Sequence, residues 1–249
     1  MAETEKADES QWQGLGVEAR AGLEARSYKK ASLPERLAGS GVDAGELLSR
    51  QGLEAVWIPG VEIFRRTVYQ QRHRGYFAEL ARGTEGILHE IGLWPRQWAT
   101  ALMFAGTAKG FHIHPPHIPE GQDAVEWMQR LFVNEPRRYD LRPYDKEQWD
   151  VMFMVRGISE MFLIDERAGM PRRKMRFFIE GDQMPGANNV AVVIPPGVAH
   201  ALRPATSEEL IMVYGTSTVF QPEFEGRIRS GVEQAFPPED WEAWWGGTR

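Results

Sequence analysis

From Val56 onward, short apolar stretches separated by glycine and proline dominate the sequence, and this pattern constrains the fold more than any other feature. Each stretch has the length of a β-strand, and helical segments are scarce between them. The stretches are residues 61–64, 101–104, 151–155, 160–164, 174–179, 190–194 and 210–214. Arg156-Gly157 and Pro195-Pro196-Gly197 provide turns between them. The pattern predicts an all-β, antiparallel barrel or jelly roll.

Segments at both ends and in the middle of the chain depart from this rhythm. Residues 1–55 are predicted to form an N-terminal arm that contains short helices, and residues 115–150 an inserted helix and loop over the barrel mouth. Trp241, Trp244 and Trp245 have the spacing of one helix face, which predicts a C-terminal helix. The expected organisation is therefore an arm followed by one barrel domain over residues 56–249.

Composition excludes several classes of function. The chain has no cysteine, which excludes disulfides, thiolate metal sites and a cysteine nucleophile. Its net charge of −6 provides no field that would attract nucleic acid, so no nucleic-acid partner is expected. The first ten residues are polar and acidic, without the apolar run of a signal or a membrane span. We therefore expect a cytoplasmic protein without a membrane partner.

Histidines gather in two places. His112 and His114 alternate with Phe111 and Ile113, so a strand here would place both imidazoles on one face. His200 follows the Pro195-Pro196-Gly197 turn. Three imidazoles with one carboxylate would suit Zn²⁺, Mn²⁺, Ni²⁺ or Fe²⁺.

These residues resemble the two sequence motifs of the cupin superfamily. Gly106, His112, His114 and Glu120 are similar to the first motif, with one residue more than usual before the glutamate. Pro195, Gly197 and His200 match the second motif. The resemblance implies a double-stranded β-helix barrel, and its metal-binding members imply His112, His114, His200 and Glu120 as metal ligands.

A narrower resemblance covers residues 60–230. Residues 74–79, 109–112, 155–157, 193–200 and 214–229 are similar to blocks of the dTDP-4-dehydrorhamnose 3,5-epimerase family. This resemblance implies that His112 is the base that removes a proton next to a keto group, and that Tyr214 is the acid on the opposite sugar face. Lys109, Arg74 and Glu79 would bind the substrate. It also implies a homodimer and no cofactor.

The chain departs from the epimerase pattern in the residues around the base. Lys109 stands in the block where the family has an arginine, and His114 stands where it has a glutamine. Asp150 aligns with a family lysine, which reverses the charge where an enolate would need a cation. The family's acidic residue that orients the base is missing, and Glu233 is a weak substitute.

Three functions are consistent with these residues. The leading hypothesis is an epimerase-like isomerase of a nucleotide-linked 4-keto sugar. The alternatives are a metal-dependent cupin enzyme, either a dioxygenase or an isomerase of a small molecule, and a sugar-binding cupin without catalysis. Structural roles are the simpler alternatives for Tyr214, as a buried hydrogen-bonded phenol, and for Arg74 and Glu79, as a cross-strand pair.

Overall fold

The computed structural model describes residues 57–114, 121, 139–140, 148–167, 171–221 and 226–228. Within these residues the chain consists of β-strands with one short α-helix, α5 (Ile87–Glu90), and one 3-10 turn, η2 (Arg72–Arg74). The strands are β1 (Glu62–Arg65), β2 (Thr67–Gln70), β3 (Tyr76–Glu79), β4 (Gln97–Met103), β5 (Lys109–Ile113), β6 (Tyr139–Asp140), β7 (Asp150–Arg156), β8 (Ile158–Asp165), β9 (Lys174–Glu180), β10 (Val190–Ile194), β11 (Val198–Pro204), β12 (Leu210–Thr216) and β13 (Gly226–Ile228). The all-β prediction is confirmed.

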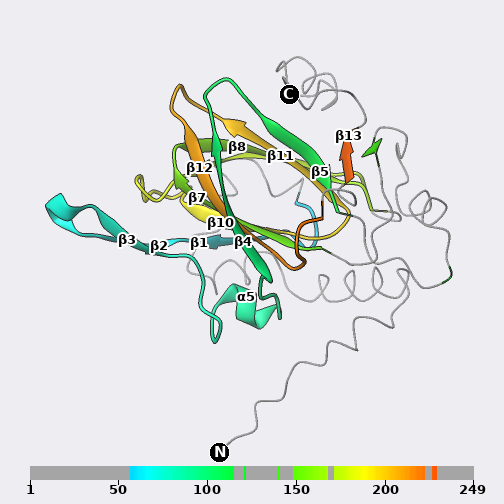
Figure 1. The fold of residues 1–249 in the computed structure, drawn as a ribbon, viewed down its shortest axis with the longest axis horizontal. Coiled ribbons are helices and arrows are strands. Elements are labelled where there is room, and N and C mark those ends of the chain that lie inside the picture. The colour runs from blue at the N-terminus through cyan, green and yellow to red at the C-terminus, as the bar shows by residue number, and fades with distance from the viewer. Residues whose placement is uncertain are drawn as a thin grey trace, which may run out of the picture.

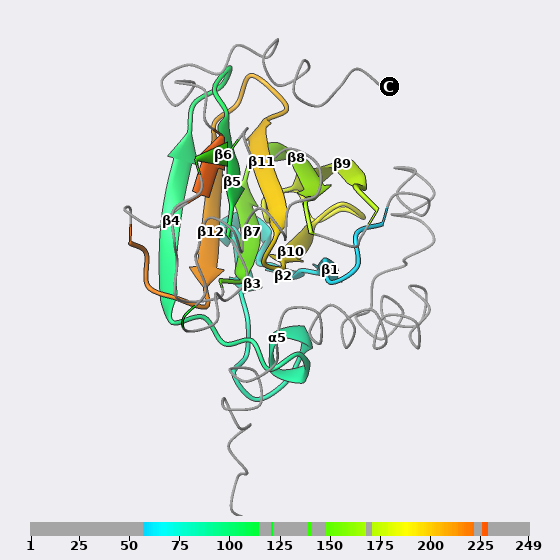
Figure 2. The same cartoon turned by 90° about the vertical axis from the view of Figure 1, so that its right-hand side faces the viewer.

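Two antiparallel sheets face each other and enclose the interior of the barrel (Figure 1 and Figure 2). One has the strand order β1-β10-β7-β12-β4, and the other has the order β6-β13-β5-β11-β8-β9. The central strands pair in a nested way: β4 with β12, β5 with β11, β7 with β10, and β8 with β9. This is the pairing of a jelly roll, in which a long hairpin folds over into two sheets. The cupin-type barrel predicted from the motifs is therefore present.

The interior contains side chains from every second position of the facing strands. On β7, Met152 and Met154 belong to the interior cluster, whereas Val151 and Phe153 pack on the outer side of the sheet. Leu88 of α5 belongs to the outer cluster and covers that side. Since side chains alternate along a strand, this parity identifies which residues of β7 face the barrel interior.

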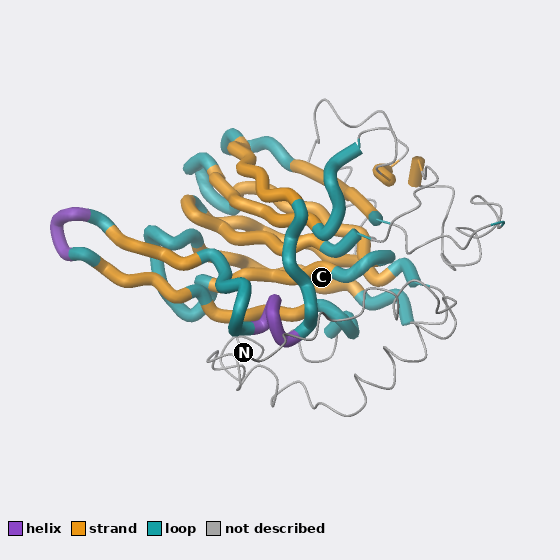
Figure 3. The backbone as a smooth tube through the Cα atoms, turned by 60° about the horizontal axis from the view of Figure 1, so that its bottom comes forward, coloured by secondary structure: helices purple, strands orange, loops and turns teal. Residues whose placement is uncertain are grey.

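The hairpin formed by β2 and β3 projects beyond the barrel, with η2 at its tip (Figure 3). Tyr69 and Phe77 stack on its surface with ring centroids 6.1 Å apart. At its base, the Arg66 side chain donates to the backbone carbonyls of Glu79 and Leu80. The same guanidinium group forms a buried ion pair with Asp182, which ties the hairpin to the barrel.

Several predicted segments fall wholly or partly outside the described residues. The N-terminal arm and the tryptophan-rich C-terminal helix lie outside them. Of the predicted 115–150 insertion, the structure describes Tyr139–Asp140 as strand β6, and Asp150 as the first residue of β7 rather than the end of a loop. In the described part of the chain, no helix has the length and apolar character needed to cross a membrane.

Candidate active site

Neighbouring strands of one sheet bring three histidines together. His112 on β5 lies directly opposite His200 on β11, and their ring centroids are 5.9 Å apart. His114 follows the end of β5, and its ring centroid is 5.4 Å from that of His200. Phe111 and Ile113, which alternate with these histidines, are fully buried on the other face. The predicted sharing of one face by His112 and His114 is confirmed.

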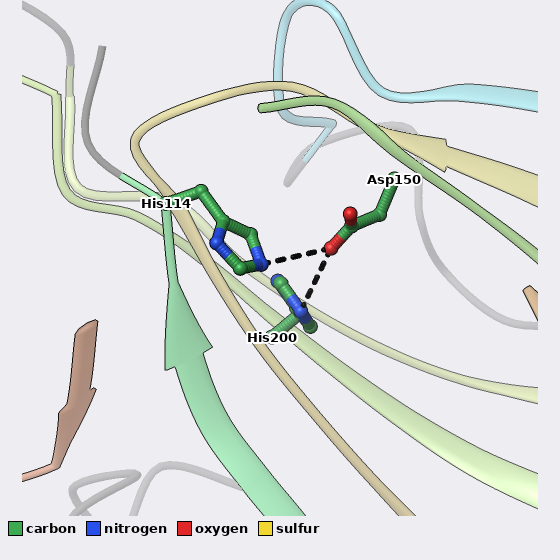
Figure 4. A group of neighbouring side chains, drawn as sticks. All are labelled: His114, Asp150 and His200. Carbon is green, nitrogen blue, oxygen red and sulfur yellow. Dashed lines mark ion pairs between the residues drawn. The ribbon is translucent and has the colours of Figure 1, made fainter. Parts of the chain in front are cut away.

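Asp150 approaches this cluster from the opposite sheet. It lies two residues before Met152 on β7 and so shares the inward face of Met152 and Met154. Its Oδ2 atom lies 3.0 Å from Nε2 of His114 and 3.3 Å from Nε2 of His200 (Figure 4). The three residues are 8% exposed or less. A single carboxylate oxygen therefore faces two buried imidazoles.

Gln148 and Thr218 support the carboxylate. The Gln148 side-chain amide donates to Oδ1 of Asp150 at 2.8 Å, and its nitrogen also lies 3.2 Å from Nε2 of His114. The Thr218 hydroxyl donates to the amide oxygen of Gln148 at 2.6 Å, which agrees with this orientation of the amide. Nothing in the sequence pattern distinguished Gln148 or Thr218, because only the fold places them beside the aspartate.

The buried environment shifts the pKa values of two of these groups. Burial lowers the pKa of His200 to about 4, and the neighbouring His114 and His112 add to this effect against the opposing attraction of Asp150. Burial alone would raise the pKa of the Asp150 carboxyl. The attraction of the histidines and the hydrogen bond from Gln148 outweigh burial and hold that pKa below its usual range. At neutral pH the site therefore contains a carboxylate beside a neutral His200.

Tyr214 lies on the wall that carries Asp150. It shares one face of β12 with Met212 and Thr216, and it packs against the interior cluster. Thr216, two residues further along β12, is the direct strand partner of Asp150. The fold thus places Tyr214 on the sheet opposite the one that holds His112.

The three predicted substrate-binding residues lie in different places. Lys109 begins β5 and is exposed, on the strand that carries His112. Arg74 lies in η2 at the tip of the projecting hairpin (Figure 3), whereas His112 and His200 lie on β5 and β11. Glu79 lies opposite Thr67, and its carboxylate pairs with Arg82. The alternative of a cross-strand pair between Arg74 and Glu79 is therefore wrong, because the hairpin register does not place them opposite each other.

One cluster of described residues has the composition of a metal site. Ligand atoms of His114, Asp150 and His200 all lie within 4.8 Å of one another. Compared with the predicted ligand set, this cluster contains Asp150 and leaves out His112. Glu120, the fourth predicted ligand, and Glu233 lie outside the described residues.

Comparisons with known proteins find distant similarities. No family model matches the chain. The spore coat polysaccharide biosynthesis protein SpsL of Bacillus subtilis (strain 168) is 25% identical over 166 residues, which cover 67% of this chain and 84% of that protein. Similar solved structures include the 3'-monoepimerase ChmJ of Streptomyces bikiniensis, with 21% identity, coverage of 68% of this chain and 69% of that chain, and a TM-score of 0.47. The RmlC epimerase of Mycobacterium tuberculosis has 19% identity, 68% coverage of both chains and a TM-score of 0.48. These structures carry the names of sugar epimerases, the type of family that the sequence blocks resemble.

Proposed function

We propose that the protein is an isomerase that epimerises a nucleotide-linked 4-keto sugar. His112 removes a proton from the carbon next to the keto group, and Tyr214 returns a proton on the other face of the sugar. The observation that carries this proposal is the placement of His112 and Tyr214 on facing sheets of one barrel. The similarity to a polysaccharide biosynthesis protein supports a substrate of this class.

The residue types suit the two proton transfers. An imidazole titrates near neutral pH and can accept a proton from a carbon made acidic by an adjacent carbonyl. A phenol can donate a proton to the opposite face of the planar enolate, and the direction of donation sets the new configuration. His200 lies beside His112 and is held neutral, so it places no positive charge next to the proposed base.

Hydrogen exchange with solvent tests the proposal directly. Wild-type protein is incubated in D₂O with a dTDP-4-keto-6-deoxyhexose, and deuterium at C3 and C5 is measured by NMR and mass spectrometry. We expect deuterium at one or both carbons. We expect His112→Gln to lower the exchange rate by a factor of about 10² to 10⁴, the usual contribution of a general base.

A second variant separates the two roles. Tyr214→Phe removes the acid but leaves the base, so we expect exchange to continue while net conversion to the epimer falls. The exposed His73 at the hairpin tip provides a control, since His73→Gln should exchange as the wild type does. Wild-type protein that introduces no deuterium at C3 or C5 would overturn the proposed function.

A further inference from the structure

Both ring nitrogens of His200 lie beside oxygen atoms that accept hydrogen bonds. Its Nδ1 lies 3.3 Å from the carbonyl oxygen of Val198, and its Nε2 lies 3.3 Å from Oδ2 of Asp150. Both neighbouring atoms are acceptors, and a neutral imidazole has one N–H. Either tautomer therefore directs a nitrogen lone pair at an oxygen, in a site where both side chains are almost fully buried.

A cation beside Nε2 would remove this conflict. The N–H at Nδ1 would then donate to Val198, and the Nε2 lone pair would bind the ion. Histidines that bind metals commonly have this arrangement, in which the second ring nitrogen donates to a backbone carbonyl or a carboxylate. Gln148 acts on the carboxylate in a corresponding way, because its amide donates to the Asp150 oxygen that faces away from His200.

We propose that Nε2 of His114, Oδ2 of Asp150 and Nε2 of His200 bind one divalent transition-metal ion. Nitrogen and oxygen ligands lie about 2.0–2.2 Å from such ions, so two ligands at octahedral or tetrahedral angles are about 3.0–3.5 Å apart. The two contacts of Asp150 Oδ2, at 3.0 and 3.3 Å, fall in this range. Two imidazoles and one carboxylate leave coordination positions open, a ligand set that suits Fe²⁺ and also Mn²⁺ or Zn²⁺.

The ion would also supply a charge that the site needs. A carboxylate beside a developing enolate is unfavourable, and a divalent ion bound to Asp150 turns the local charge positive. An open coordination position would then accept the keto oxygen of the substrate and polarise it. This role rests on the proposed function, whereas binding of the ion rests on the site geometry alone.

Metal binding is tested on full-length protein prepared without a nickel column. After treatment with a chelator and gel filtration, Mn²⁺, Zn²⁺ and, without oxygen, Fe²⁺ are titrated by calorimetry, and bound metal is measured by mass spectrometry. We expect one equivalent of at least one ion. Asp150→Asn and His114→Gln should each weaken binding by 100-fold or more, and circular dichroism checks that each variant is folded.

His112→Gln is the matched control, because His112 lies beside His200 but outside the group of three ligands. This variant should bind metal as the wild type does, although we expect it to lose deuterium exchange. Less than a tenth of an equivalent of all three ions, or binding that both ligand variants leave unchanged, would overturn the proposed site. Metal binding without exchange would reject the epimerase function alone, and exchange that is unaffected by a chelator would reject the catalytic role of the ion.

Discussion

The buried Arg66 side chain contacts both Asp182 and Phe153. Its Nε and Nη2 atoms donate to the two carboxylate oxygens of Asp182 at 3.1 and 2.9 Å, and its guanidinium carbon lies 4.9 Å from the ring centroid of Phe153. The side chains of Arg66 and Asp182 are only 1% and 2% exposed. Water therefore cannot replace the partner of Asp182 if the arginine is lost.

We predict that Arg66→Met lowers the free energy of unfolding by about 3–5 kcal/mol, because it leaves a buried carboxylate without its cation. Denaturant unfolding measures this difference. Arg82→Met is the control, since Arg82 forms ion pairs with Glu79 and Glu85 but its side chain is 53% exposed. That change should cost less than about 1 kcal/mol. Equal effects of the two substitutions would contradict the role given to Arg66.

The sequence predicted the residues of the candidate site only in part. His112, His114 and His200 were found because two short motifs and strand alternation place them on one wall. In the sequence, Asp150 stood out because it replaces a family lysine and so reverses the charge. Its contact with two histidines arises only because the two sheets face each other. Such a contact joins residues far apart in the chain, and local periodicity contains no information about it.

Among the strands and helices, the long interior strands were the most predictable from the sequence. The strand β10 coincides with the apolar stretch 190–194, and β12 extends the predicted stretch 210–214 by two residues. The strands β2 and β3 were not predicted as a pair, because their residues are mainly polar or exposed and lack a buried face. β6 and β13 are short and pair with each other across a long separation in sequence, which no local pattern reveals.

The turn between β7 and β8 depends on a glycine. Gly157 has a φ of +83°, and a Cβ atom there would lie 2.6 Å from the backbone carbonyl oxygen of Glu209. Gly106 has a similar φ of +75°, but a Cβ atom at this position would have no neighbour within 4 Å. The two glycines share the conformational constraint, and only Gly157 adds a backbone clash.

We predict that Gly106→Ala destabilises the protein by about 1–2 kcal/mol, the cost of a left-handed conformation for an L-residue. Gly157→Ala should cost clearly more, because the backbone of Glu209 must also move. Denaturant midpoints of the two variants, compared at equal m-values, measure the difference. If Gly157→Ala proved as stable as Gly106→Ala, the close approach of Gly157 to the backbone of Glu209 would be incorrect.

The buried site makes the stability of the folded protein depend on pH. The pKa of His200 is about 4 in the folded protein, compared with 6.5 for a free imidazole. Between these values the unfolded chain binds more protons, so this contribution is complete above pH 6.5 and is lost as the pH falls towards 4. The lowered pKa of Asp150 acts in the same direction at still lower pH.

We predict that the metal-free wild-type protein loses about 3 kcal/mol of stability through His200 between pH 6.5 and 4. His200→Gln removes this titration, so the variant should lose less stability than the wild type over the same range. Chemical unfolding at a series of pH values in the presence of a chelator measures both profiles. Parallel profiles would show that the pKa of His200 is not lowered in the folded protein.

Asp150 comes from one side of the barrel, and His114 and His200 come from the other. This arrangement also affects how the purified protein behaves. An ion bound by all three residues would link the two sheets for as long as it stays bound. At an ion concentration 100 times the dissociation constant, such a ligand adds about 2.7 kcal/mol to stability. Two preparations of identical sequence would then unfold at different temperatures, because the buffers and columns used for each would leave different amounts of bound ion.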